Sequence, residues 1–234
     1  MKSKVLIVAL AAVLLLSACS TTAPQDNNIA ATNEQNENPV SIDQESNSSG
    51  EKIHYNLMSA DWPVYNDVKE LTRAGNVIVL GKITDISFEI LDRMTAKPPT
   101  SASETENCYL NTIYTVEVIT TYKGISTKTI KVRMLGGLEG VYVKEQIAVL
   151  GDMASEGISI MDGSPNLEIG QTYLFVLYQY GDSMPTLVNV KQGVYGIDDP
   201  LAKDEYSYVS LKEIISSFGE DNWAAFESYK NAFD

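Results

Sequence analysis

Runs of strand-forming residues separated by glycines constrain the fold of this chain more than any other feature. Six runs are rich in Val, Ile, Thr and Tyr and are bounded by turn residues; they cover residues 76–91, 111–124, 129–135, 171–180, 186–190 and 193–197. Strands that follow one another with little helix between them leave unpaired edges, and closure into a barrel removes those edges. The sequence therefore predicts a mainly β fold built on a small antiparallel β-barrel.

Two of these runs also predict how their strands are placed. In residues 129–135, Ile130, Val132 and Met134 alternate with polar residues, as in a strand with one buried face. Residues 171–180 are almost continuously apolar, which is typical of a strand covered on both faces. We therefore expect the second of these strands to lie at the centre of the fold.

Capping residues predict three helices beside the strands. Asp61 is the expected N-cap of an N-terminal helix that Gly75 ends. Near the C-terminus, Ser210 and Glu213 form a capping-box pattern, and Asp221 is the expected cap of a second helix. The fold should therefore have one N-terminal helix and two C-terminal helices.

The order of three motifs resembles a known barrel family. The motifs AGNVIVLGKITDI, TIYTVEVITTYKG and IGQTYLFVLYQYG follow one another between Ala74 and Ile197. This order resembles the OB-type barrel of netrin-like modules, which include the inhibitory domain of tissue inhibitors of metalloproteinases. The same run is similar to lipoproteins of Gram-positive bacteria, for which no activity is established. The resemblance implies an OB-like barrel and a place in the cell envelope.

The N-terminus has the pattern of a lipoprotein signal peptide. An apolar run over residues 5–16 is too short for a permanent membrane helix, and it leads into Ser-Ala-Cys. This pattern predicts a signal peptide over residues 1–18 and cleavage between Ala18 and Cys19. The Cys19 thiol would then carry a diacylglyceryl group, with a further acyl chain such as palmitate on its amine. An ordinary secretory signal that ends at a cysteine is the alternative.

Composition divides the mature chain into two parts. Residues 19–51 are rich in Asn, Gln, Ser and Thr and bury too little apolar surface to fold, so we expect a disordered tether. Residues 52–234 are long enough for a single domain, within which 138–165 gives no clear pattern. The lipid should hold the protein on the cell membrane, with this domain on the extracytoplasmic face.

The charge of the chain limits its partners. The formal net charge is −14, and it becomes −16 when Lys2 and Lys4 leave with the signal peptide. A phosphate backbone is bound by clustered Lys and Arg, and the sequence has no basic stripe. Nucleic acid is therefore excluded as a partner, and the acyl chains rather than a polybasic patch should hold the membrane.

The cysteine count predicts a fold without an internal disulfide. Only Cys19 and Cys108 are present, and the first is committed to lipid. A reactive Cys108 thiol is an alternative interpretation. It would need a nearby base or positive field, and the only histidine, His54, is distant in sequence.

The sequence offers little for catalysis or metal binding. It lacks the Gly-x-Ser-x-Gly, His-Glu-x-x-His, Gly-Lys-Ser and Cys-x-x-Cys patterns. Glu117 would be a candidate acid if it pointed inward from its apolar strand, and an outward Glu117 is the alternative. Asp198, Asp199, Asp204 and Glu205 offer oxygen ligands for calcium but lack EF-hand spacing, which favours a solvated loop. We predict no catalytic residue, no metal and no cofactor.

Two functions remain open from the sequence. The favoured one is a lipid-anchored binding module for an envelope protein, a peptide or a wall glycan. The candidates for its face are Tyr109, Tyr114, Tyr122, Tyr142, Tyr178 and Tyr180, and the alternative is that these tyrosines fill strand surfaces. The alternative is an envelope enzyme that uses carboxylates alone, which two carboxylates in a concave pocket would favour. A protease-inhibitor-like module would need the free amine of an N-terminal cysteine on the barrel, and Cys19 is committed to lipid.

Overall fold

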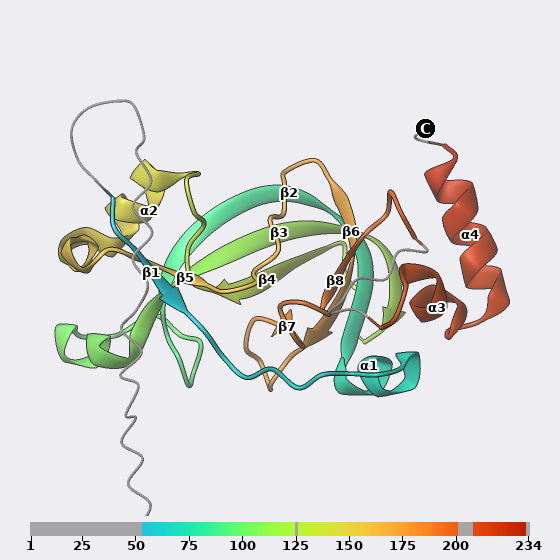
Figure 1. The fold of residues 1–234 in the computed structure, drawn as a ribbon, viewed down its shortest axis with the longest axis horizontal. Coiled ribbons are helices and arrows are strands. Elements are labelled where there is room, and N and C mark those ends of the chain that lie inside the picture. The colour runs from blue at the N-terminus through green and yellow to red at the C-terminus, as the bar shows by residue number, and fades with distance from the viewer. Residues whose placement is uncertain (1–52, 125, 201–207, 233–234) are drawn as a thin grey trace, which may run out of the picture. The chain divides into compact units, whose positions relative to one another are not determined.

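The computed structural model describes residues 53–124, 126–200 and 208–232 (Figure 1). The chain divides into two compact units, Met1–Glu37 and Asn38–Asp234, and every described residue belongs to the second. The strands are β1 Tyr55–Met58, β2 Val77–Asp92, β3 Cys108–Lys123, β4 Thr129–Leu135, β5 Ile158–Met161, β6 Thr172–Tyr178, β7 Thr186–Leu187 and β8 Val194–Gly196. The α-helices are α1 Val68–Ala74, α2 Val143–Leu150, α3 Leu211–Ser216 and α4 Glu220–Lys230, and the 3₁₀ helices are η1 Ala102–Asn107 and η2 Gly151–Glu156.

Five strands close into a barrel. They pair in the order β2-β3-β4-β7-β6, and β6 pairs in turn with β2 to complete the ring. All of these pairings are antiparallel except that of β4 with β7, which is parallel and joins Arg133 to Thr186. The short strand β8 pairs antiparallel with Tyr173–Phe175 of β6, on the same edge that pairs with β7. The predictions of a mainly β fold and of a barrel are confirmed.

The central strands are apolar because both of their faces are covered. On β2, Val77 and Val79 point into the barrel interior, while Ile78 and Leu80 point outward into a second core formed with the helices. The strand β6 alternates in the same way and pairs with β2, β7 and β8. Its predicted central position is therefore confirmed. The prediction that β4 has one buried face is also confirmed, because Val132 lies in the barrel interior.

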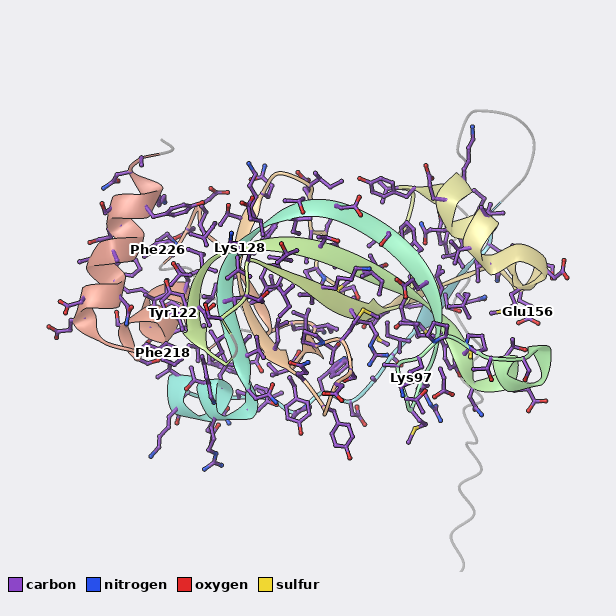
Figure 2. All side chains as sticks on the ribbon, turned by 180° about the vertical axis from the view of Figure 1, so that it is seen from behind. Lys97, Tyr122, Lys128, Glu156, Phe218 and Phe226 are labelled. Atoms are coloured by element: carbon purple, nitrogen blue, oxygen red, sulfur yellow. The ribbon has the colours of Figure 1, made fainter. Side chains whose placement is uncertain are left out.

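Three helices pack against the outer face of β2 and β6. Leu71 of α1, Ile214 of α3 and Phe226 of α4 are all buried in this second core. Tyr122 of β3 also contributes by stacking on Phe218, with ring centroids 5.7 Å apart (Figure 2). Burial of these side chains, rather than helix propensity, holds such short helices in place.

The caps of these helices match the predictions in part. Ser210 and Glu213 form the predicted capping box of α3. The prediction of Asp61 as N-cap of the first helix is wrong, because α1 begins at Val68 and the Asp67 carboxylate accepts a hydrogen bond from Glu70 N at 2.8 Å. Asp221 is not a cap either. The chain leaves α3 through Gly219, which has a φ of 128° and directly precedes α4.

The segment that the sequence left unassigned contains α2, η2 and β5. The strand β5 pairs in parallel with β1, so that Tyr55 lies opposite Ile158. These two residues and Leu150 of α2 belong to a third buried cluster, together with Phe88 and Leu110 from β2 and β3. This cluster is separate from the barrel interior and lies at the β1, β5 and α2 end of the long strands (Figure 1).

Candidate functional site

Residues 59–66, which we call the strap, join β1 to α1 without regular secondary structure. Two buried amide side chains hold them. Asn189 Nδ2 donates a hydrogen bond to Pro63 O at 2.9 Å. Gln192 Oε1 accepts from Tyr65 N and its Nε2 donates to Tyr65 O, each at 3.0 Å. Asn189 is 3% exposed and Gln192 is 1% exposed, so these bonds are partly shielded from water and hold the strap in place.

The two amides come from the turn between β7 and β8, and the turn is itself ordered. Asn189 Oδ1 accepts a hydrogen bond from Lys191 N at 2.7 Å. Gly193 ends the turn, and a Cβ at this position would lie 2.6 Å from Asn189 O and 2.8 Å from Leu187 Cβ. The close approach of the backbone therefore requires glycine where the chain enters β8.

A cavity of about 230 Å³ lies between the strap and this turn. We call it the strap pocket. It combines residues from the strap, from the segment after β5, from the β7–β8 turn and from the residues just before α3. These residues are Ala60, Asp61, Trp62, Val64, Asp162, Asn189, Lys191, Gln192 and Tyr208. Val64 and Tyr208 are 57% and 51% exposed, so the pocket is open to solvent.

One wall of the strap pocket is formed by Lys191 and Asp162. Gly163, which follows Asp162, has a φ of 71°, a conformation that favours glycine. A Cβ on Gly163 would lie 2.5 Å from Lys191 Cε and 3.4 Å from its Cγ. The aliphatic part of Lys191 therefore crosses over this glycine, and this contact orients the lysine beside the pocket.

Charged and aromatic groups dominate the lining of the strap pocket. Asp61 and Asp162 bring two carboxylates and Lys191 brings one ammonium group, so the lining has a formal charge of −1. Trp62 and Tyr208 add aromatic rings. The Trp62 indole nitrogen is buried and has no hydrogen-bond partner among the described residues. The described lining residues include no Ser, Thr, Cys or His, so the functional groups of this lining are carboxylates, an ammonium group, side-chain amides and aromatic rings.

The predicted tyrosine face is wrong. Tyr114 is fully buried inside the barrel, and burial raises the pKa of its hydroxyl far above the usual value. Tyr122 is committed to its stack on Phe218. Tyr109 lines a different cavity, and Tyr142 lies against Phe88 beside α2. The remaining two, Tyr178 and Tyr180, are exposed near the end of β6. These tyrosines face different surroundings because Tyr109, Tyr114, Tyr122 and Tyr178 lie on strands, whereas Tyr142 directly precedes α2 and Tyr180 follows β6.

The other candidate residues do not form a site among the described residues. Glu117 is exposed on β3, so the alternative of an outward side chain is the correct one. Asp198 and Asp199 are exposed on the loop after β8, while Asp204 and Glu205 lie outside the described residues. Ala18 and Cys19, the predicted cleavage and lipidation residues, also lie outside them.

Cys108 lines a second cavity, of about 480 Å³, at the start of β3. Its side chain is buried, at 6% exposure. Glu106 and Glu156 share this lining, and none of the described residues that line the cavity is basic. Carboxylates disfavour the thiolate form, and a reactive cysteine needs a positive neighbour. The environment of Cys108 therefore gives no support to a catalytic thiol.

The sequence did not single out the residues that make the strap pocket. Asn189 and Gln192 resemble ordinary loop residues, and nothing in the sequence relates them to a strap more than a hundred residues earlier. Asp61 was assigned to a helix cap instead. The one usable signal was Trp62, a large aromatic residue in a segment without helical or strand periodicity.

No group of three or more His, Cys, Asp or Glu side chains is arranged to hold a metal ion within residues 53–124, 126–200 and 208–232. In that part of the chain, no helix is both long enough and apolar enough to span a membrane.

No protein-family model matches the chain. Comparison with curated proteins gives no match either.

Proposed function

We propose that this chain is a lipid-anchored binding module of the bacterial cell envelope. In this account residues 1–18 are removed, Cys19 carries the lipid, and residues 19–51 tether a single domain, residues 52–234, on the extracytoplasmic face of the membrane. The N-terminal pattern supports the anchor, because a short apolar run after two lysines ends at Ala18-Cys19. Two or three acyl chains would make the attachment stable.

We also propose that the barrel is of the OB type. The five strands of the ring follow the order β2-β3-β4-β7-β6, in which the last two strands of the sequence exchange places and β4 meets β7 in parallel. This arrangement agrees with a five-stranded Greek-key barrel. Its interior is filled by side chains such as Tyr114, Val132 and Phe175, so a ligand would have to bind outside it.

The strap pocket is the observation that carries the binding function. Two buried amides, Asn189 and Gln192, fix the strap through three hydrogen bonds and so form a concave site before any ligand arrives. A preformed site with aromatic and charged groups is typical of ligand recognition. We infer that an envelope protein, a peptide or a wall glycan places one group in this pocket.

Filling the strap pocket tests this function. Ala60 is an exposed residue of its lining, and Ala60→Trp adds a bulky ring there. Ala225→Trp adds the same ring at an exposed position of α4, which contributes no residue to the pocket. We expect the full chain with Ala225→Trp to retain an envelope component as the wild type does. The full chain with Ala60→Trp should no longer retain it. Equal retention by the two variants would contradict the assignment.

A carboxylate-only enzyme is the second candidate, because Asp61 and Asp162 line the same concave site. Glycoside hydrolysis needs two such groups, one as acid and one as base or nucleophile. The chain with Asp61→Asn or Asp162→Asn distinguishes the two functions. If the wild-type chain hydrolyses a wall glycan and both variants lose this activity, the protein is an enzyme. Retention of the component without its conversion supports the binding module.

A further inference from the structure

The charge of the strap pocket selects among possible ligands. This argument rests on the proposed binding function and concerns the same pocket. Asp61 and Asp162 contribute two carboxylates to its lining, and Lys191 contributes one ammonium group. A ligand that covers the pocket removes water from these groups, and a buried charge is costly unless it is paired. A neutral ligand would leave one carboxylate uncompensated, whereas a ligand with one positive charge makes the lining neutral.

The aromatic residues of the strap pocket favour the same kind of ligand. Trp62 and Tyr208 both line it, and the faces of aromatic rings attract organic cations. The other tryptophan of the chain shows this pairing within the structure, because Lys212 Nζ lies 5.1 Å from the centre of the Trp223 ring. The rings of Trp and Tyr also provide apolar surface for the carbon chain that carries the cation.

The size of the strap pocket limits what enters it. Its volume of about 230 Å³ is smaller than the 300 Å³ or so at which pockets for drug-sized molecules begin. It therefore suits one side chain rather than a long segment. The negative net charge of the whole chain, −14, also favours the approach of a cation.

We propose that the strap pocket binds a primary alkylammonium group, the end of a lysine-type side chain carried by an envelope peptide or protein. Asp61 and Asp162 would pair with the ammonium group, and the Trp62 ring would contact its carbon chain. Asn189 and Gln192 are positioning residues, because they hold the strap that carries Asp61 and Trp62.

Tryptophan fluorescence tests this proposal directly, because the chain has two tryptophans. In the full chain with Trp223→Phe, Trp62 is the only source of the signal. We expect Nα-acetyl-lysine methylamide to change its emission in a saturable manner and Nα-acetyl-norleucine methylamide, which lacks the amine, to give no change. Salt should weaken the binding. If Trp223→Phe prevents folding, ¹⁹F spectra of the 5-fluorotryptophan-labelled wild type, assigned with Trp62→Phe, provide the same readout.

Charge variants decide whether the carboxylates of the strap pocket are responsible. The pair Asp61→Asn and Asp162→Asn should weaken binding of the lysine compound about tenfold, as expected for loss of a charged hydrogen-bond partner. Asp152→Asn with Asp221→Asn removes the same charge at exposed positions outside the pocket and should have little effect. Equal weakening by both pairs, or equal binding of the norleucine compound, would overturn the proposal.

The two sets of experiments distinguish an error in the proposed ligand class from an error in the proposed binding function. If Ala60→Trp abolishes retention of an envelope component but the lysine compound gives no response, the pocket binds another chemical group and only the ligand class is wrong. If Ala60→Trp has no effect on retention, the proposed function itself fails. If the wild type binds the lysine compound and the Ala60→Trp variant does not, both the function and the ligand class are supported. The ¹⁹F signal assigned to Trp62 reports this, because the variant contains an additional tryptophan.

Discussion

At the scale of single residues, Lys123 determines how the barrel meets its first helix. Its Nζ donates hydrogen bonds to Thr72 O and Gly75 O, both at 2.7 Å. These carbonyl groups lie at the C-terminal end of α1, where backbone acceptors have no partner within the helix and a positive charge is favourable. The Tyr-Lys-Gly turn at the end of β3 therefore serves a structural purpose, which the pattern of the sequence alone did not indicate.

We expect Lys123→Met to destabilise the fold by about 2 kcal/mol, because the apolar stem remains while the charged donor to two carbonyl groups is lost. Lys131→Met is the matched control. Lys131 is exposed and makes one ion pair, 3.9 Å from Glu89, so its loss should cost well under about 1 kcal/mol. Urea unfolding of the two variants measures the difference. Similar free energies of unfolding would contradict the role of Lys123.

Tyr122 makes the stability of the fold depend on alkaline pH. Burial raises the pKa of its hydroxyl from 10.0 to about 12. The unfolded chain releases this proton near its ordinary pKa while the folded chain retains it, so the free energy of unfolding should be unchanged below pH 10.0 and fall between there and about pH 12. Tyr122→Phe keeps the ring stacked on Phe218 and should reduce this fall. Urea unfolding across this range is the test, and an identical pH profile for the variant would refute it.

At the scale of secondary structure elements, Gly81 permits the close contact of β2 with β3. A register shift lies between Leu80 and Gly81, and a Cβ at Gly81 would collide with Val116 Cγ1 and lie 2.8 Å from Glu117 O. This glycine therefore coincides with an irregularity in the ladder. It allows β2 to pair with β3 along its whole length and with β6 over its first part.

Gly81→Ala should destabilise the barrel by about 1 to 3 kcal/mol, because the added methyl group overpacks a contact with backbone. Gly196→Ala in β8 is the matched control, since no atom lies within 4 Å of the Cβ it would add. The comparison of the two unfolding curves measures the effect. A control variant that is destabilised as much as Gly81→Ala would contradict this explanation.

The strands were predictable where their own sequence carries the packing. The bounds of β4 were predicted as observed, because Val132 and its neighbours alternate between the barrel interior and solvent. The segment with α2 and β5 was not predictable, because its elements are short and depend on contacts with distant residues. The strand β5 pairs with β1, and Asn56 Nδ2 donates to Glu156 O at 2.6 Å across a hundred residues.

The candidate site was even less predictable. The strap pocket combines four segments, and the groups that build it are loop residues without periodicity. Asn189 and Gln192 become structural only because the fold places Pro63 and Tyr65 opposite them. By contrast, of the six tyrosines that suggested a binding face, Tyr114 lies in the barrel interior and Tyr122 packs against the second core. Local patterns thus predict packing, whereas a site made from nonlocal contacts leaves little trace in the sequence.

At the scale of the whole molecule, the account joins a membrane anchor to a binding domain. The anchor makes a prediction of its own. Mass spectrometry of the processed protein should find fatty acyl groups on Cys19 at its N-terminus, and Cys19→Ala should release the chain from membranes. Cys108→Ala is the control, since this residue is buried at the start of β3 and should have no influence on attachment. An unmodified N-terminus would contradict the lipoprotein interpretation.

Photocrosslinking in intact cells shows whether the strap pocket binds an envelope component. Benzoylphenylalanine in place of Val64, which is exposed and lines the pocket, should crosslink to an envelope component on irradiation. The same residue in place of Met94, which is exposed outside the pocket, should not. We predict a crosslinked product at position 64, and we expect the yield of this product to fall when Asp61→Asn and Asp162→Asn are introduced. No product at position 64, or equal products at both positions, would contradict the account.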